Sequence, residues 1–314
     1  MPKVSVVIPT YNRSELIRRT MRSVENQTFE DWELIVVDDG SEDETEKIVK
    51  SKKSSKINYV SHKRNRGASA ARNTGIEASS GEYVAFLDAD DEWIPTKLEL
   101  QVGKMDDTNV EIVYCSERVK GRGKNKVRRA KSYIKNARKK LMKKDYIGSC
   151  SKVMARRRSL REAGLFDESL SSQQDWDMWF RLSKFGDVAG VENVLVVKHL
   201  HEKNISNSLE KEVSGKVKVY EKQKKHFKEK KDVLAYRSKK LSIYTLAYSF
   251  EKGYELAITS LREKKIQPKL LLALLVSFAN RKTYKKIFLI WRAVRGHTYD
   301  EVENNVLAKM LKEI

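Results

Sequence analysis

The chain has 314 residues, of which 40% are hydrophobic, so it can bury a substantial core and is too long for one small domain. Lys and Arg number 64 against 43 Asp and Glu, which gives a formal net charge of +21. This excess of positive charge indicates an anionic partner, such as nucleic acid, a membrane surface or a phosphorylated substrate.

Composition also argues against two classes of protein. The two cysteines, Cys115 and Cys150, are too few for a disulfide framework. The most apolar stretch, residues 270–279, has about half of the ~20 residues that a membrane span needs. Because the N-terminal segment also lacks the long apolar region of a signal peptide, we expect a cytoplasmic protein, which can rest on the inner face of the cell membrane.

Strands and helices are predicted to alternate along the first third of the chain. Apolar runs predict strands at residues 4–8, 34–37, 57–60, 83–87 and 111–115. Helical spacing and start signals predict helices at residues 14–24, 43–50, 68–78 and 95–105. This alternation predicts βαβ units and an α/β fold with a doubly wound, mainly parallel sheet.

The pattern changes after the fifth strand. Residues 118–144 contain many Lys and Arg but no Asp or Glu, and we expect an exposed basic loop followed by a helix. Such a segment is either a solvated surface or a binding surface. Residues 147–179 return to a compact pattern of buried and polar positions.

From about residue 211 the pattern is helical throughout. Helix-length apolar faces lie at residues 233–250, 254–262, 268–278 and 284–294. We therefore predict two domains, an α/β domain at 1–210 and a basic α-helical region at 211–314. The helix at 284–294 has Lys and Arg on one side and apolar residues on the other, which suits either a membrane interface or ordinary packing.

Two carboxylates stand where the predicted strand 83–87 ends. Asp88 and Asp90 follow it directly, and such groups are costly near a core unless they are paired or bound to a cation. Hard oxygen ligands suit Mg²⁺ or Mn²⁺. An acidic turn before the next helix is the alternative interpretation.

Other polar segments are expected at the same edge, because the carboxyl ends of parallel strands lie together and form the ligand crevice of such sheets. They are the segment 9–12 after the first strand, Asp38 and Asp39 after the second, and Arg72 with Asn73 in a helix. A turn, a carboxylate, an arginine and a carboxylate pair suit a metal-bound nucleotide diphosphate. The chain has neither a G-x-x-x-x-G-K-[ST] nor a G-x-G-x-x-G sequence, which argues against a P-loop ATPase and a dinucleotide oxidoreductase.

Taken together, these segments resemble the family 2 glycosyltransferases over roughly residues 3–208. The motifs that carry the resemblance are Val4–Asn12, Val37–Ser41, Ala71–Asn73, Gly81–Asp91 and Gln174–Trp179. The resemblance implies the GT-A fold and an inverting enzyme that takes a sugar from a nucleotide-diphosphate donor, commonly a UDP-sugar. It also implies a Mn²⁺ or Mg²⁺ ion and a glycan or lipid-linked acceptor.

The resemblance assigns nucleotide-binding roles by motif position. Pro9, Thr10 and Tyr11 would hold the base and ribose, and Asp39 would accept a hydrogen bond from the base. Arg72 would face the diphosphate. For Asp38, beside Asp39, a cap on the next helix is the preferred interpretation.

The resemblance also assigns the metal and the base. Asp90 would bind the metal directly, Asp88 would contact ribose or the metal and its water, and His201 would approach the diphosphate or the metal. Asp175 matches the catalytic base. Its rival is Asp177, but residues two apart on a helix point to different sides, and motif position favours Asp175.

Three alternatives stay open at this point. A nucleic-acid-binding protein would explain the charge but leaves the ordered carboxylates unexplained. A GT-A nucleotidyltransferase would share the fold and metal, yet it normally has a glycine-rich basic loop where this chain has residues 10–13. A catalytically inactive family member is the third.

Overall fold

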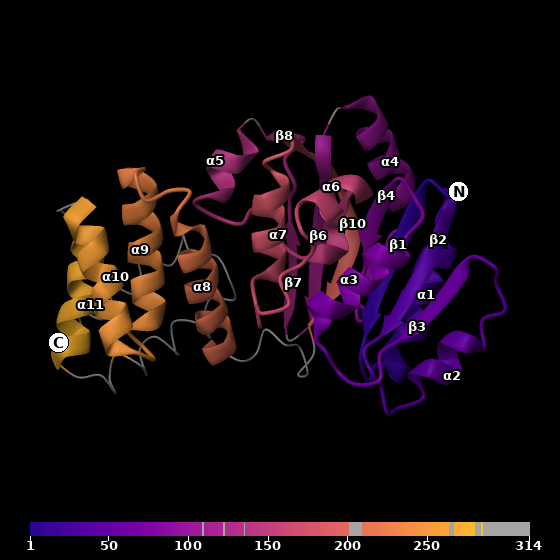
Figure 1. Cartoon of the computed structure of the whole chain (residues 1–314), viewed down its shortest axis with the longest axis horizontal. Coiled ribbons are helices and arrows are strands. Elements are labelled where there is room, and N and C mark those ends of the chain that lie inside the picture. Colours follow the sequence, from indigo (N-terminus) through magenta and orange to yellow (C-terminus); the bar gives the residue numbers. More distant parts are fainter. Residues whose placement is uncertain are drawn as a thin grey trace. The chain divides into compact units, whose positions relative to one another are not determined.

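The computed structural model describes residues 1–108, 110–121, 123–134, 136–200, 209–263, 267–279 and 284. The chain forms two compact units, Met1–Asn207 and Ser208–Ile314. The first unit holds the sheet and its covering helices, and the second is built from helices (Figure 1).

Ten strands within the described residues form one sheet. Its main path runs β3 (Ile57–Ser61), β2 (Trp32–Asp38), β1 (Val4–Thr10), β4 (Tyr83–Phe86), β9 (Val153–Arg156), β6 (Val110–Gly121), β10 (Asp187–His199) and β5 (Glu92–Trp93). Beside this path, β7 (Lys124–Arg128) pairs with β6, and β8 (Tyr133–Ile134) pairs with β10.

Most strands of the main path run in one direction. Strands β1, β2, β3 and β4 pair in parallel, and β10 is parallel to β6. Strand β9 is antiparallel to both β4 and β6, so β6 has the direction of β4. The prediction of an α/β fold with a mainly parallel sheet is confirmed.

Helices cover both faces of the sheet. On one face, α1 (Ser14–Glu25), α2 (Thr45–Lys50) and α4 (Lys97–Asp107) pack on the main core, as the buried Ile17, Val49 and Val102 show. On the other face, α3 (Ala68–Ala78) packs through Ala71 against Ile35 and Val37. The ring of Trp179 in α7 (Gln174–Leu182) lies 6.4 Å from that of Phe86 on this second face. The sheet is therefore doubly wound.

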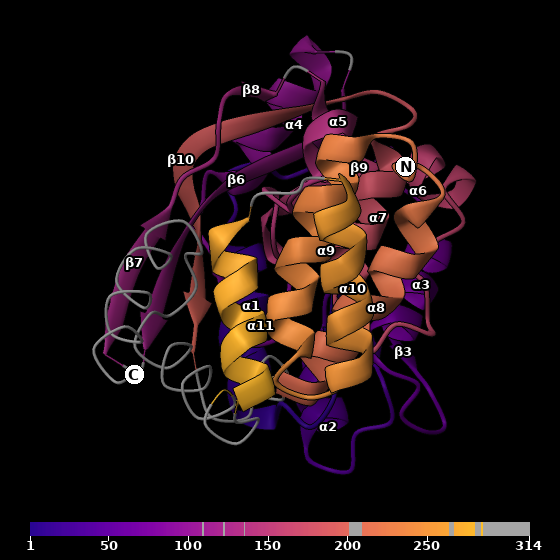
Figure 2. The same ribbon diagram turned by 90° about the vertical axis from the view of Figure 1, so that its left-hand side faces the viewer.

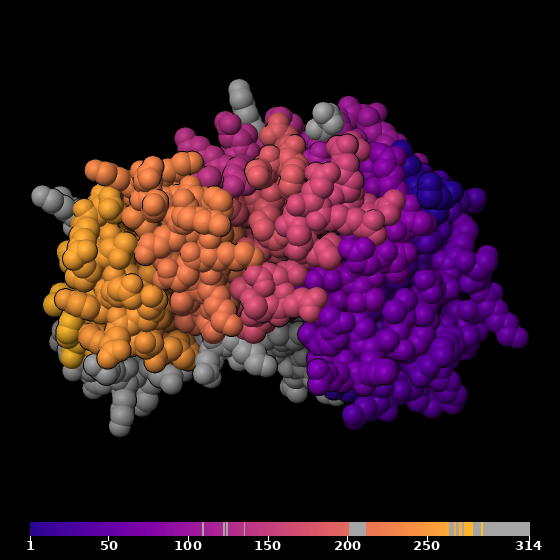
Figure 3. Space-filling model, viewed as in Figure 1, coloured from indigo at the N-terminus to yellow at the C-terminus, as the bar shows by residue number. Residues whose placement is uncertain are grey.

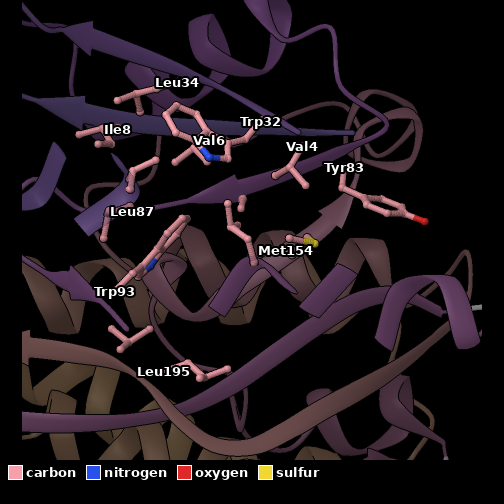
Figure 4. Close-up of a cluster of buried hydrophobic side chains, with 14 of the residues drawn as sticks. Val4, Val6, Ile8, Trp32, Leu34, Tyr83, Leu87, Trp93, Met154 and Leu195 are labelled. Carbon is pink, nitrogen blue, oxygen red and sulfur yellow. The ribbon is translucent and has the colours of Figure 1, made fainter. Parts of the chain in front are cut away.

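The main core has the composition expected of a parallel sheet buried on both faces, where strands read as continuous apolar runs. Figure 4 shows alternate residues of β1 in this core, Val4, Val6 and Ile8, beside Leu34 and Leu87. Such burial holds the carboxyl ends of the strands in fixed positions, and these ends carry the polar residues of the candidate site.

The segment after residue 117 differs from the prediction of a loop followed by a helix. Strand β6 continues to Gly121 and pairs antiparallel with β7, which makes a hairpin, and the helix α5 spans only Ala137–Leu141. Val119 is buried while its neighbours Arg118 and Lys120 are exposed. This alternation with a period of two is typical of a strand, and the density of charge masked it in the sequence.

The second unit consists, within the described residues, of α8 (Leu209–Lys224), α9 (Lys231–Thr245), α10 (Phe250–Glu263) and α11 (Pro268–Ala279). Figures 2 and 3 show this unit in orange and yellow. The helix predicted at 233–250 corresponds to α9, which ends earlier, at Thr245, and the helix predicted at 254–262 corresponds to α10, which begins earlier, at Phe250.

The helix predicted at 284–294 lies outside the described residues except for Tyr284, which is buried against the core of the second unit. In the described part of the chain, every helix is too short or too polar to cross a bilayer.

Candidate active site

The carboxyl ends of β1 and β2 bring the first two predicted segments together. Strand β1 runs through Pro9 to Thr10, slightly further than predicted, and Thr10 pairs with Asp38 of β2. The amide of Asp39 donates to the carbonyl oxygen of Thr10 at 2.8 Å. Asp39 therefore lies directly beside the end of β1.

The Asp39 carboxylate is held by groups from the loop after β3. Its Oδ1 atom lies 2.7 Å from Nδ1 of His62 and accepts a hydrogen bond from the Arg66 amide at 2.9 Å. Its Oδ2 atom accepts one from the Gly67 amide at 2.6 Å. A carboxylate has about four acceptor positions, so one position on Oδ2 stays available to a ligand.

The backbone conformation directly after Asp39 requires a glycine, which is Gly40. Its φ is +80°, and a Cβ atom there would lie 2.9 Å from the backbone carbon of Arg64. Only glycine combines this left-handed conformation with so close an approach. The motif Asp38–Ser41 thus brings the loop after β2 against the loop that binds Asp39.

The three residues predicted to hold the base and ribose differ in exposure. Pro9 is half-buried, Thr10 is buried and Tyr11 is exposed at the surface. The Thr10 hydroxyl is buried and has no hydrogen-bond partner within the described ranges. A buried hydroxyl without a partner is unfavourable, so Thr10 is a ready donor or acceptor for a ligand.

Asp38 has a structural role. Its Oδ1 atom accepts a hydrogen bond from the Ser41 amide at 2.8 Å, and its Oδ2 atom accepts one from the Tyr59 hydroxyl at 2.8 Å. Asp38 therefore stabilises the turn after β2, whereas the first turn of α2 receives its side-chain bond from Asp43.

Arg72 and Asp88 form a buried ion pair. Helix α3 places the Arg72 guanidinium 2.7 Å from Oδ1 of Asp88, at the end of β4, and over the ring of Phe166. Burial opposes ionisation of Asp88, but the positive charges of Arg72 and Lys198 outweigh it and hold its pKa below the usual value. The Nε–H group of Arg72 is buried and makes no hydrogen bond to the part of the chain that the structure describes, so this guanidinium retains a donor.

Ser151 links the carboxylates that follow β4. Its buried hydroxyl accepts a hydrogen bond from the Asp88 amide at 3.1 Å and donates to Oδ2 of Asp91 at 2.7 Å. Asp91 is fully buried, and burial raises its pKa to about 7. Asp90 lies half-buried between these two, and its carbonyl oxygen accepts a hydrogen bond from Arg19.

Asp175 lies in the first turn of α7 and shares its surroundings with the Arg72–Asp88 pair. Burial and the negative charge of Asp145 raise the pKa of Asp175 to about 7, against the opposing effects of the Trp176 amide, Arg72 and Lys198. The Trp176 amide donates to its Oδ1 atom at 2.8 Å. A carboxyl group with a pKa near 7 is suited to accept a proton at neutral pH.

Its rival Asp177 is fully buried and pairs with Arg181 at 2.9 Å, one helical turn further along α7. This ion pair gives Asp177 a structural role, as expected from the different directions of residues two apart on a helix.

The comparisons with known proteins agree with this geometry. The sequence profile named Glycosyl transferase family 2 matches residues 5–164, about half of the chain. The putative colanic acid biosynthesis glycosyl transferase WcaA of Escherichia coli is 31% identical over 254 residues, which cover 78% of this chain and 87% of WcaA.

The chain belongs to glycosyl transferase family 2.

Not every relative in this family is matched over its full length. An uncharacterized glycosyltransferase of Rickettsia bellii is 37% identical over 196 residues, which cover 62% of this chain but only 28% of that relative. The chain thus spans less than a third of this longer relative.

Solved structures show the same fold. TarS 1-349 of S. aureus, in complex with UDP-GlcNAc, superposes with a TM-score of 0.66 at 17% identity. The match covers 91% of this chain and 90% of the TarS chain. The mannosyltransferase PcManGT of Pyrobaculum calidifontis, in complex with GDP-Man and Mn²⁺, superposes with a TM-score of 0.60 at 19% identity. That match covers 99% of this chain and 86% of the PcManGT chain. The predicted GT-A fold and family 2 membership are confirmed.

The family 2 site also contains groups that sequence reasoning missed. Lys198, at the end of β10, is held protonated by Asp91 and Asp88, whose charges raise its pKa against the effect of burial. His62 and Ser151 were missed as well. The polar residues that follow the apolar run 194–197 were a signal for Lys198, but nothing in the sequence marked the other two.

Two histidines stand at the end of β10 and just after it in the sequence, His199 and His201. His201 lies outside the described residues, so its predicted role as a metal ligand stays a prediction. The ring of His199 lies 2.6 Å from a carboxylate oxygen of Glu92.

The residues present fit a divalent cation that is bound by one or two protein carboxylates and mainly by the phosphate oxygens of a nucleotide. In the described part of the chain, no group of three or more His, Cys, Asp or Glu side chains is arranged to hold a metal. Asp88 and Asp90 nevertheless supply hard oxygen donors at the end of β4. Mg²⁺ is commonly held by one or two carboxylates together with phosphate oxygens, which matches this donor set.

Proposed function

We propose that the protein transfers a sugar from a nucleotide-diphosphate donor, a UDP-sugar, to a hydroxyl group of a glycan or lipid-linked acceptor, with inversion at the anomeric carbon. The observation that carries this proposal is the carboxyl group of Asp175, whose pKa is raised to about 7 beside the Arg72–Asp88 pair. A base next to a phosphate-binding arginine suits a single displacement.

Asp175 acts as the base in this mechanism. It accepts the proton of the acceptor hydroxyl as the oxygen attacks the anomeric carbon and the bond to the nucleoside diphosphate breaks. A positioned base contributes about 10²–10⁴-fold to the rate. A pKa of about 7 makes a substantial fraction of Asp175 ionised at neutral pH.

Arg72 stabilises the leaving group. Its buried Nε–H group has no hydrogen-bond partner among the described residues, so it is available to a diphosphate oxygen. Asp88 keeps the guanidinium in place through the bond of 2.7 Å. A divalent cation held by Asp90 and Asp88 together with the diphosphate would neutralise the negative charge that develops there.

Asp39 selects the nucleobase of the donor in this proposal. With Oδ1 occupied by His62 and the Arg66 amide, and Oδ2 by the Gly67 amide, the carboxylate offers a single acceptor position. Uracil presents one ring N–H between two carbonyl groups, whereas guanine presents an N–H and an amino group side by side. One acceptor position therefore matches uracil, and the TarS complex with UDP-GlcNAc supports the choice.

The test is the hydrolysis of α-linked UDP-sugars in the absence of an acceptor, in which water takes the place of the acceptor hydroxyl. Proton NMR at early times distinguishes the anomers of the released sugar. We expect UDP and the β-anomer, with much slower release in Asp175→Asn. Early release of the α-anomer would contradict inversion. Formation of UTP and sugar 1-phosphate when pyrophosphate is added would indicate a nucleotidyltransferase.

A further inference from the structure

The basic hairpin of β6 and β7 lies in register with a lysine of the candidate site. Val119 of β6 pairs with Lys126 of β7 on one side and with Lys198 of β10 on the other. Directly paired residues of neighbouring strands project from the same face of a sheet. Lys126 and Lys198 therefore share one face, about 10 Å apart across two strand spacings. Figure 2 shows β7 beyond β6, away from the rest of the sheet.

Two residues earlier in β6, on the same face of the sheet, Glu117 also lies between paired residues of β7 and β10. Glu117 of β6 pairs with Arg128 of β7 and with Val196 of β10. The Arg128 guanidinium lies 3.0 Å from Oε1 of the buried Glu117 and is itself 42% exposed. The ammonium group of Lys152 lies 3.9 Å from the same oxygen. Positive charges thus continue from the candidate site to the edge of the hairpin.

No carboxylate of the hairpin beyond Glu117 balances these charges. Residues 118–144 contain neither Asp nor Glu. Lys126 is exposed, and the buried Glu117 is already engaged by Arg128. Positive charge therefore lies at both ends of this face, on Lys198 beside the acidic cluster and on the exposed Lys126 and Arg128 at the hairpin edge, whereas Val119 and Glu117 between them are buried. The exposed edge suits the anionic part of a ligand whose other end reaches the site.

We propose that Lys126 and Arg128 bind a phosphate group of the acceptor, close to the sugar whose hydroxyl is attacked. This inference rests on the transferase function proposed above. An ammonium group and a guanidinium with free N–H groups are suited to phosphate oxygens. The phosphate belongs either to the diphosphate that joins a glycan to a lipid carrier or to a phosphodiester of a glycan polymer.

The hairpin provides a matched control. Lys120 is adjacent in sequence to Val119, so its side chain projects from the opposite face of β6. It is exposed like Lys126. Lys126→Glu and Lys120→Glu therefore change the net charge of the protein equally, but only Lys126→Glu changes the face that continues to Lys198.

The experiment is a calorimetric titration of the 314-residue chain and both variants, with UDP and Mn²⁺ present in excess so that the donor site is filled. The two probes are geranyl diphosphate and an oligomer of glycerol phosphate. We expect one probe to bind, about tenfold more weakly to Lys126→Glu and less than twofold more weakly to Lys120→Glu. The probe that binds identifies the source of the phosphate.

Three results would overturn the proposal. The first is equal weakening by both substitutions, and the second is binding of neither probe. Tighter binding of duplex DNA than of both probes, again equally sensitive to the two substitutions, would also overturn it. UDP binding is measured first in each protein. If the wild type does not bind UDP, the proposed transferase function is refuted. The probe titrations are then repeated without UDP, so that binding of the phosphate probes is tested independently of that result.

Discussion

Asp175 and Asp177 lie two residues apart in α7, yet the structure gives them different surroundings. Asp175 is close to Arg72 and Asp145 at the end of the sheet, whereas Asp177 is fully buried and paired with Arg181. The first is arranged to exchange a proton, and the second holds the helix in place.

The two aspartates should therefore respond differently to substitution. We expect Asp175→Asn to slow UDP release from a UDP-sugar by about 10²–10⁴-fold, with the Kd for UDP nearly unchanged. We expect Asp177→Ala to lower the free energy of unfolding by about 3 kcal/mol, because the half-buried Arg181 loses this carboxylate and, within the described residues, keeps only its bond to the Ala163 carbonyl oxygen. Steady-state kinetics and urea unfolding measure these effects, and the reverse pattern would make Asp177 the base.

The charge of Asp145 controls the pH at which Asp175 ionises. Burial and then Asp145 raise the pKa of Asp175, while Arg72 and Lys198 lower it. Because the base must be deprotonated, kcat/KM should rise with pH through an apparent pKa near 7. Asp145→Asn removes the repulsion but keeps an acceptor for the Ile147 and Gly148 amides, so the rise should move to lower pH. An unchanged pH profile would contradict this coupling.

His62 is a positioning residue that acts through Asp39. Its ring lies between Oδ1 of Asp39 and the Thr74 hydroxyl, at 2.7 and 2.9 Å. We expect His62→Ala to weaken UDP binding about tenfold, which is the scale of a hydrogen bond to a charged group. His62→Asn retains a donor near the position of Nδ1 and should restore much of the affinity. Calorimetry measures both, and wild-type affinity in His62→Ala would exclude the role.

At the scale of the elements, helix α4 contains a buried lysine, Lys97, whose surroundings disfavour its charged form. Lys97 is fully buried, and its ammonium group lies 3.7 Å above the centre of the Trp93 ring. Burial lowers its pKa from 10.5 to about 8. Trp93 itself lies in the core and donates to the Ser151 carbonyl oxygen, so this lysine is part of the packing behind the site.

The stability of the fold should depend on pH through Lys97. Below pH 8 the residue is charged in both states, and its burial destabilises the folded state. Between about pH 8 and 10.5 the unfolded chain binds more protons at this position, so the free energy of unfolding rises with pH. Lys97→Met should stabilise the protein by about 1–3 kcal/mol at pH 7, after the loss of the contact with Trp93.

Urea unfolding at pH 7 and at pH 9.5 tests this prediction, with Lys104→Met in the same helix as the control. The advantage of Lys97→Met should shrink at the higher pH, whereas the control should change little at either. A variant that is less stable than the wild type at pH 7 would show that the cation above Trp93 is net stabilising.

The elements also show where sequence patterns succeed and fail. The order of strand ends predicted which segments meet, because parallel pairing fixes one edge for all of them. The face on which Lys198 lies could not be predicted, since β10 has register shifts between Val191 and Val194 and between Val194 and Val196. Each shift interrupts the alternation of sides on which such a prediction depends.

Contacts between distant loops were equally inaccessible from the sequence. Ser151 binds groups 60 and 63 residues away, and His62 lies 23 residues from Asp39. No local periodicity encodes such pairs. The resemblance to family 2 assigned ligand-binding roles to particular positions, but it did not assign the residues of this chain that hold those positions in place.

At the scale of the whole molecule, all described residues of the candidate site and of the basic hairpin belong to the unit Met1–Asn207. The unit Ser208–Ile314 has its own core, centred on buried residues such as Leu246, Ala257 and Leu270. On α11 it exposes Leu271, Leu275 and Phe278 at a spacing of one face of a helix. A role of this unit at an anionic membrane surface stays a prediction.

The central claim is that the edge formed by Asp39, Arg72, Asp88 and Asp90 binds a uridine diphosphate with a divalent cation. Calorimetric titration of UDP into the wild type and Asp90→Ala, with Mn²⁺ or with a chelator, tests it most directly. We expect binding with Mn²⁺ that is lost with the chelator and at least tenfold weaker in the variant. Failure of the wild type to bind UDP with any divalent metal would contradict the claim.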